Sequence, residues 1–300
     1  MGLLHPKPLV GGDEVLIVAP ARKVDRTAIY QARDLLSSWG LRVRFGKHLF
    51  AEHDQFAGTD EERLEDLQAA LDDPTAKAIL CARGGYGTSR IVDRLSINGF
   101  RRHPKWLVGF SDITAIHGWL VDQSAVTLHA TMPQLMVRDA ETVSAESLRR
   151  ALFGQKPLIE APTHPLNRPG VVRGRVVGGN LSMVVHNLGS VSDVATRGRI
   201  LFLEDLDEYL YHIDRMMVQL RRSGKLAKLA GLVVGTFSDM RDHDSPFGKQ
   251  AYEIIAEHVA DYSYPVGFNF PVGHAPPNMA LPMGIEAKLE VGDSSARLVY

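Results

Sequence analysis

The sequence predicts an α/β fold in two parts, an N-terminal parallel-sheet domain and a smaller mixed α/β C-terminal domain. Three observations support this prediction. Strand and helix patterns alternate through the first half, a proline-rich stretch interrupts them, and two short strand patterns separated by a Gly-Asp turn end the chain. We expect an N-terminal domain at residues 1–155, a linker at 156–170 and a C-terminal domain at 171–300.

The elements of the first half follow from the spacing of their apolar residues. Residues 15–19 form an apolar run typical of a buried strand, and apolar residues recur at helical spacing over 29–39. Thr59 and Glu62 have the spacing of a capping box, so a second helix is expected to begin there. Further strands are predicted from residue 43, at 78–81 and just before Ser111. Repeated strand–helix units imply a Rossmann-like parallel sheet with helices on both faces.

The second half contains fewer regular repeats. Its predicted elements are a strand at 171–177, a helix from Leu181, a strand at 200–203, a long helix at about 209–222, an apolar run at 229–234, and two strands at 285–291 and 296–300. Because ligands bind beyond the carboxyl ends of parallel strands, we expect functional residues where these strands end.

The composition excludes several classes of partner. With 34 Lys and Arg against 35 Asp and Glu, the chain has no excess positive charge for nucleic acid or anionic lipid. No apolar stretch has the length of a membrane span. Cys81 is the only cysteine, so an intrachain disulfide is excluded. Because the first residues also lack the apolar region of a signal peptide, we expect a cytoplasmic protein that binds neither nucleic acid nor membrane.

The most informative local feature is the junction at Ser111. An apolar strand ends at this serine, and a helical pattern resumes at once. Such a turn exposes the hydroxyl and directs the following backbone N–H groups outward, which provides a nucleophile and half of an oxyanion hole. On this motif alone a helix N-cap is the preferred explanation, because strand–serine–helix junctions are common. The choice between the two therefore depends on residues elsewhere in the chain.

A serine nucleophile needs a base and a group that orients the base. Glu204 ends the strand predicted at 200–203, and His274 begins a loop that contains two prolines and Asn278. These two residues have the required chemistry. Because Ser111 lies in the first domain and the other two lie in the second, we expect the active site at the domain interface.

Three other features allow more than one interpretation. The glycine-rich segment 84–87 is compatible with a phosphate cradle, but it lacks the P-loop lysine, which favours an oxyanion or peptide-binding loop. Glu208 and His212 lie four residues apart and suit a metal site, but no matching His or Cys cluster lies nearby. Arg83 suits bidentate binding of a substrate carboxylate or a structural role beside the loop.

An ordered set of motifs supports a functional interpretation. The motifs are Arg83-Gly84-Gly85-Tyr86-Gly87, Gly109-Phe110-Ser111-Asp112-Ile113-Thr114, Gly178-Gly179-Asn180-Leu181, Leu203-Glu204-Asp205, Tyr211-His212-Ile213-Asp214-Arg215-Met216 and Gly273-His274 through Leu281-Pro282-Met283-Gly284. Together they closely resemble the LD-carboxypeptidase family of serine peptidases, which also contains the microcin C immunity peptidases. The resemblance runs from about Glu14 to Val291.

The resemblance implies a reaction and a catalytic triad. Ser111 would be the nucleophile, Glu204 the orienting carboxylate and His274 the base. The expected function is hydrolysis of the L,D-amide bond that releases a terminal D-amino acid from murein tetrapeptides in peptidoglycan recycling. The resemblance implies a homodimer that uses no metal or organic cofactor. The alternatives are a microcin C-type peptidase that detoxifies a peptidyl-nucleotide, and a non-catalytic ligand-binding protein.

The resemblance also suggests residues around the triad. Backbone N–H groups of Asp112 and of the pair Gly84 and Gly85 would form the oxyanion hole, and which of the two glycines serves is left open. The candidates for substrate binding are Arg83, Tyr86 and Asn180.

Overall fold

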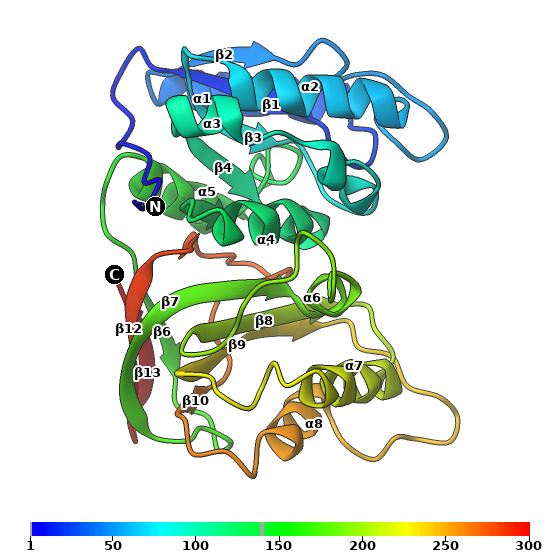
Figure 1. The fold of residues 1–300 in the computed structure, drawn as a ribbon, viewed down its shortest axis with the longest axis vertical. Coiled ribbons are helices and arrows are strands. Elements are labelled where there is room, and N and C mark those ends of the chain that lie inside the picture. Colours follow the sequence, from blue (N-terminus) through cyan, green and yellow to red (C-terminus); the bar gives the residue numbers. More distant parts are fainter. Residues whose placement is uncertain (1, 139–140) are drawn as a thin grey trace.

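The computed structural model describes residues 2–138 and 141–300 as two sheets stacked along the long axis of the molecule (Figure 1). One sheet comes mostly from the first half of the chain and the other from the second half. Helices flank both sheets. The two-part α/β fold predicted from the sequence is confirmed.

The N-terminal sheet has six strands in the order β11-β5-β4-β3-β1-β2. Five of them are parallel: β1 (Glu14–Val18), β2 (Arg42–Phe45), β3 (Ala76–Cys81), β4 (Trp106–Gly109) and β5 (Thr127–His129). The connecting helices are α1 (Arg26–Ser38), α2 (Asp60–Asp72), α3 (Asn98–Arg102), α4 (Thr114–Asp122) and α5 (Thr142–Leu152). Side chains of β1 alternate between two cores: Ile17 packs with residues of α1 and α5, whereas Leu16 packs with residues of α2 and α4.

Capping residues explain where two of these helices begin. The hydroxyl of Thr59 accepts the backbone N–H of Glu62, whose carboxylate accepts the N–H of Thr59. The predicted capping box is therefore confirmed. Asp25 caps α1 by accepting the N–H of Ala28 at 2.8 Å. Within the described ranges, no helix combines the length and the apolar character that a membrane span requires.

The C-terminal sheet is mixed and has the order β10-β9-β8-β7-β12-β13-β6. Its strands are β6 (Leu158–Pro162), β7 (Gly170–Asn180), β8 (Ile200–Leu206), β9 (Gly231–Ser238), β10 (Val266–Gly267), β12 (Glu286–Val291) and β13 (Ser295–Val299). The strands β7 to β10 are parallel, and β12, β13 and β6 pair antiparallel. The helices of this half are α6 (Leu181–His186), α7 (Leu210–Arg222) and α8 (Ala251–His258).

Part of the stretch expected to be a linker is a strand. Residues 158–162 form β6, which pairs with β13 at the edge of the C-terminal sheet. Its side chains alternate, and Ile159 and Ala161 are buried. The prolines did not prevent pairing, because Pro162 is the last residue of an edge strand, where a missing N–H is tolerated.

The N-terminal sheet is not wholly parallel, because one of its strands comes from the second half of the chain. Strand β11 (Leu281–Met283) returns from the second half and pairs antiparallel with β5. It covers the edge of β5 that would otherwise expose unpaired backbone groups. The loop that carries His274 therefore leads from the C-terminal sheet into the N-terminal one.

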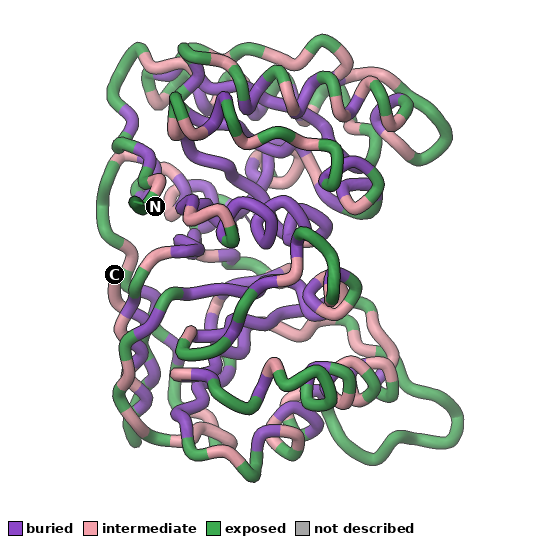
Figure 2. Tube along the Cα trace, in the orientation of Figure 1, coloured by how far each residue is buried: buried purple, intermediate pink, exposed green. Residues whose placement is uncertain are grey.

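Helix α4 lies between the two sheets (Figure 1). Residues 114–121 of this helix are all buried, and Figure 2 shows the same continuous burial along it. A helix that is buried on every side belongs to the core. Gly118 marks its closest approach to the C-terminal half, because a Cβ there would lie 2.3 Å from the carbonyl oxygen of Ser192.

We predict that Gly118→Val destabilises the protein, because the added side chain must push the two halves apart. The free energy of unfolding should fall by about 1–3 kcal/mol, measured by urea unfolding with a matching decrease in Tm. Gly11→Ala is the control, since a Cβ at Gly11 meets nothing within 4 Å. Equal stability of the two variants would contradict close packing at α4.

Candidate active site

The turn at Ser111 has the geometry of an exposed nucleophile. Strand β4 ends at Gly109, Phe110 is extended, and Ser111 has a φ of 64° before a 3-10 turn leads into α4. Positive φ at a residue with a side chain is strained, and such strain is typical of a nucleophile held on a sharp strand-to-helix turn. An ordinary N-cap does not need this conformation, because it is usually extended.

A buried histidine holds this turn in place. The Nε2–H of His117 donates to the carbonyl oxygen of Gly109 at 2.8 Å, and its Nδ1 accepts the hydroxyl of Thr127 at 2.8 Å. Burial lowers the pKa of His117 to about 4. It is therefore neutral at physiological pH and acts as a fixed hydrogen-bonding bridge beneath the serine.

Glu204 and His274 form a partly buried hydrogen-bonded pair. The Nδ1–H of His274 donates to Oε2 of Glu204 at 2.7 Å, and Glu204 is fully buried at the end of β8. Gly273 permits this approach, because its φ is 139° and a Cβ there would lie 2.3 Å from Oγ1 of Thr236 and 3.0 Å from Glu204. The bond fixes the proton on Nδ1 and leaves Nε2 free to accept one.

The carboxylate also controls the charge of the imidazole. Burial alone lowers the pKa of His274, but the charge of Glu204, its hydrogen bond and the charge of Asp205 outweigh burial and raise that pKa above its ordinary value. A base with a raised pKa binds a proton more strongly. His274 is therefore suited to remove a proton from a hydroxyl at neutral pH.

The fold brings the serine and the histidine to the same place from different halves of the chain. The ring of Phe110, next to Ser111, lies 4.8 Å from the ring of His274 between centroids. Within the described ranges no hydrogen bond joins the Ser111 hydroxyl to His274. Catalytic hydrogen bonds of this kind often tighten only when substrate binds.

The glycine-rich loop lies directly beside Ser111. A Cβ on Gly84 would lie 3.0 Å from Cβ of Ser111 and 3.3 Å from the backbone nitrogen of Asp112. Gly85 has a φ of 111°, and a Cβ there would lie 2.5 Å from Cδ of Arg22. In the part of the chain that the structure describes, the backbone N–H groups of Gly84, Gly85 and Asp112 donate no hydrogen bond. They are available to an oxyanion.

The three candidate substrate contacts differ in their surroundings. Arg83 is partly buried and donates to the carbonyl oxygen of Lys23 at 3.1 Å. Tyr86 is 41% exposed and its ring packs against that of Phe56. Asn180 is only 3% exposed and caps α6. Arg83 and Tyr86 are therefore accessible to a ligand, and Asn180 is largely enclosed by protein.

Asn180 instead links the two halves of the site. Its side-chain N–H donates to Oδ1 of Asp205 at 2.7 Å, and its oxygen accepts from Ser182 and Met183. Its backbone N–H donates to Oγ1 of Thr114 at 3.1 Å. Thr114 lies three residues after the serine and Asp205 lies next to Glu204, so this chain of bonds leaves no amide atom of Asn180 free.

Sequence reasoning did not identify the residues that hold the His274 loop. The side chain of Asn278 accepts the N–H of Gly273 at 3.1 Å, and the N–H of Asn278 donates to the hydroxyl of Ser144 in α5 at 2.8 Å. Ser147, also in α5, accepts the N–H of Ala280 at 3.0 Å. Only the position of Asn278 close after His274 gave any signal in the sequence.

The rival metal site has little support from the geometry. Nδ1 of His212 and Oε2 of Glu208 lie 2.8 Å apart and bond to each other. Over residues 2–138 and 141–300, no group of three or more His, Cys, Asp and Glu side chains is arranged to hold a metal ion. Like His117, His129 is buried, and burial lowers its pKa well below the usual range, so this histidine is neutral.

Comparison with known proteins gives consistent matches over almost the whole chain. Residues 15–130 match the model of the LD-carboxypeptidase N-terminal domain, and residues 173–289 match that of the LD-carboxypeptidase C-terminal domain. A probable murein peptide carboxypeptidase of Bacillus subtilis is 34% identical over 97% of this chain and 93% of its own length.

Two solved structures have the same fold. The crystal structure of muramoyltetrapeptide carboxypeptidase from Oxalobacter formigenes has a TM-score of 0.88 and 29% identity, and the match covers 95% of this chain and 98% of that one. The microcin C7 self immunity protein MccF, in the apo state of an inactive mutant, has a TM-score of 0.87. It is 20% identical over 99% of this chain and 98% of its own, so it supports the fold alone.

We predict that Glu204→Gln lowers the pKa of His274, because burial then acts without an opposing negative charge at that position. The decrease should be at least about one pH unit, measured by NMR titration of the imidazole. Glu208→Gln is the matched control, because Glu208 bonds His212 instead. The same pKa for His274 in wild type and Glu204→Gln would contradict the role given to Glu204.

Proposed function

Because the chain belongs to the LD-carboxypeptidase family, we propose that it releases the terminal D-amino acid of murein tetrapeptides by hydrolysing their L,D-amide bond. The chain is a serine-type carboxypeptidase. The proposed substrate is supported by relatives that are named for murein peptides and muramoyltetrapeptides. Release of the terminal residue would serve the recycling of peptidoglycan.

The observation that carries the proposed mechanism is the 2.7 Å bond between His274 and the fully buried Glu204, beside a serine held at positive φ. Nε2 of His274 takes the proton of Ser111 as Oγ attacks the scissile carbonyl. Glu204 stabilises the imidazolium that forms. His274 then gives the proton to the departing amino group, and a water molecule hydrolyses the acyl-enzyme by the same steps in the second half-reaction.

Backbone N–H groups stabilise the negative charge that develops on the carbonyl oxygen. Asp112 contributes the group that follows the nucleophile, and the pair Gly84 and Gly85 contributes from the facing loop. Their unpaired N–H groups and the approach of Gly84 to Ser111 support this assignment. The mechanism uses side chains and backbone groups alone, without a metal ion or organic cofactor.

We assign recognition of the terminal carboxylate to Arg83, with Tyr86 covering the substrate. Burial lowers the pKa of the Arg83 guanidinium, and the charges of Arg22 and Arg138 lower it further. Such a gathering of positive charge is relieved by a bound carboxylate. Arg83 follows β3 and precedes the glycine pair, at the same edge of the sheet as Ser111.

We further propose that the protein acts in the cytoplasm as a homodimer. The single cysteine, Cys81, is buried and free, which suits a reducing compartment. The dimer is proposed from the family resemblance, and light scattering on the purified protein would measure it directly.

A peptidase that acts on a peptidyl-nucleotide is the second candidate. Its support is an aromatic cluster after β8, in which Tyr209 and His243 stack at 4.5 Å between ring centroids and Tyr211 is 38% exposed. Such rings suit stacking by a nucleobase. Trp106 and Trp119 are buried and offer no such surface. The relatives named for murein peptides favour the first candidate.

We predict that Ser111→Ala abolishes release of the terminal D-amino acid, with a loss in kcat of at least about 10⁴-fold. Binding of the tetrapeptide should be retained, because only a hydroxyl is lost. The assay measures amino acid released from a murein tetrapeptide, with a peptide ending in an L-amino acid as control. Retention of more than roughly a tenth of the activity would rule out Ser111 as the nucleophile.

A further inference from the structure

Helix α2 carries a buried cation that the proposed mechanism does not use. The side chain of Arg63 is fully buried, which is rare for arginine. Burial lowers the pKa of its guanidinium, and the charge of Asp60 acts against that effect. A buried charge loses its hydration, so it needs hydrogen bonds or ion pairs with the protein to compensate.

Those contacts join two loops at the edge of the sheet where the serine lies. Nη1 of Arg63 donates to the carbonyl oxygen of Pro20 at 2.7 Å and to that of Gly87 at 2.9 Å. Pro20 follows β1, and Gly87 ends the glycine-rich segment after β3. A single guanidinium therefore ties the glycine-rich loop to the neighbouring strand end.

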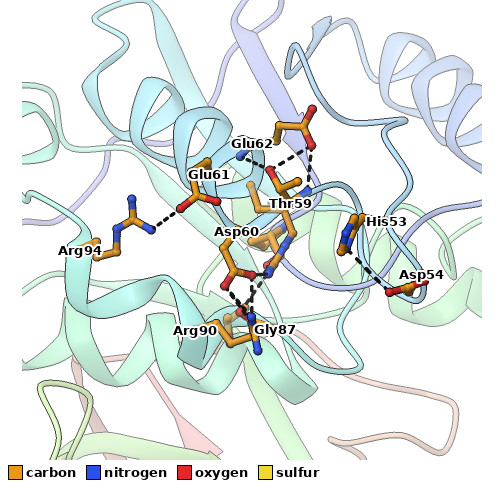
Figure 3. Close-up of polar contacts among 12 residues, drawn as sticks. His53, Asp54, Thr59, Asp60, Glu61, Glu62, Gly87, Arg90 and Arg94 are labelled. Atoms are coloured by element: carbon orange, nitrogen blue, oxygen red, sulfur yellow. Dashed lines mark hydrogen bonds and ion pairs between the residues drawn. The ribbon is translucent and has the colours of Figure 1, made fainter.

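Asp60 holds the guanidinium in this position. It pairs with Arg63 through Oδ1, and Arg90 donates from Nε to both of its oxygens at 2.9 Å. Figure 3 shows Asp60 beside Arg90 and Gly87. The ring of Phe56 lies 4.8 Å from the guanidinium carbon of Arg63. A Cβ at Gly87 would lie 2.6 Å from Nη1, so glycine is required for this approach.

The same end of the loop is also tied to Asp112, the residue after Ser111. The N–H of Thr88 donates to Oδ2 of Asp112 at 2.9 Å, and its hydroxyl donates to the carbonyl oxygen of Asp112 at 2.7 Å. All of these groups are buried. The loop from Gly84 to Gly87 contains no helix or strand, so contacts such as those at Gly87 and at Thr88 are needed to hold it in place.

We propose that Arg63, held by Asp60, is a positioning residue that fixes the glycine-rich loop so that its backbone N–H groups face the oxyanion. The inference rests on the proposed roles of Ser111 and of the loop. Arg63 touches no substrate and acts through the carbonyl oxygen of Gly87. Its loss should therefore weaken stabilisation of the transition state more than it weakens substrate binding.

The test compares Arg63→Met with wild type. Methionine fills similar volume and removes every donor. We expect kcat to fall by about 100-fold, the loss typical of one oxyanion-hole donor, with KM changed by less than about threefold. Kinetics are measured well below the Tm of the variant, so that lost stability alone does not lower kcat. Arg63→Lys keeps the positive charge and one donor nitrogen, and it should recover part of kcat.

The matched control is Arg94→Ala. Arg94 pairs at 3.2 Å with Glu61, which lies on the exposed side of helix α2, the helix that carries Arg63 (Figure 3). The Arg94→Ala variant should leave kcat, KM and Tm unchanged.

If Arg63→Met does not fold, Asp60→Asn provides the test. Asp60 is partly exposed, and loss of its negative charge releases the guanidinium of Arg63. Asp60→Asn should lower kcat by about tenfold, a smaller loss than that expected for Arg63→Met, because the guanidinium is still present. A wild-type kcat in a folded Arg63→Met, or in Asp60→Asn if Arg63→Met does not fold, would overturn the proposal.

A second measurement separates this inference from the proposed substrate. The rate at which a fluorophosphonate labels Ser111, followed by mass spectrometry, depends on the oxyanion hole but needs no peptide. Slow labelling of Arg63→Met supports the positioning role even if wild type does not cleave murein tetrapeptides. Labelling at the wild-type rate overturns it. Wild type left unlabelled at Ser111 would overturn both the nucleophile and the positioning role.

Discussion

The active site depends on one buried contact between the two halves of the molecule, where the end of β7 meets the start of α4. The backbone N–H of Asn180 donates to Oγ1 of Thr114 at 3.1 Å, and a Cβ at Gly179 would lie 2.6 Å from the same oxygen. Thr114 follows the serine turn, and the Asn180 side chain reaches Asp205 beside Glu204. Any shift at this contact would move Ser111 relative to His274.

The loop of His274 is held from both sides of the same interface. Gly273 rests against Glu204 in the C-terminal half, while Ser144 and Ser147 of α5 bind the loop from the N-terminal half. Strand β11 then completes the N-terminal sheet. His274 is therefore anchored to both halves, so neither half alone holds all three residues of the proposed triad. Burial and the charge of Glu204 raise the pKa of Asp205 to about 7. Two carboxyl groups therefore lie close together at this interface.

Local patterns predicted the parts of the fold and site that depend on neighbours in sequence. The strand before Ser111, the capping box at Thr59 and the closing hairpin all follow from spacing alone. The pairing of β11 with β5 was not predictable in this way, because it joins segments about 150 residues apart. A three-residue strand also has too short a pattern to recognise.

The residues that support the site could not be identified from the sequence, for a related reason. Arg63 lies in a helix whose apolar spacing predicts contacts at Leu64, Leu67 and Leu71, and a charged residue beside them is normally placed in solvent. Its burial depends on the carbonyl oxygens of two distant loops. Asn180 belonged to a recognisable motif, but only its tertiary contacts show that its amide is already bonded.

The most direct test is a crystal structure of the protein after inactivation with a fluorophosphonate. The account predicts a covalent adduct on Oγ of Ser111, with the phosphonyl oxygen about 3 Å from the backbone nitrogens of Asp112 and of the glycine pair Gly84 and Gly85. Nε2 of His274 should lie within hydrogen-bonding distance of the adduct. An adduct on another residue would contradict the account. So would a phosphonyl oxygen that faces solvent, away from the backbone N–H groups of Asp112 and the glycine pair.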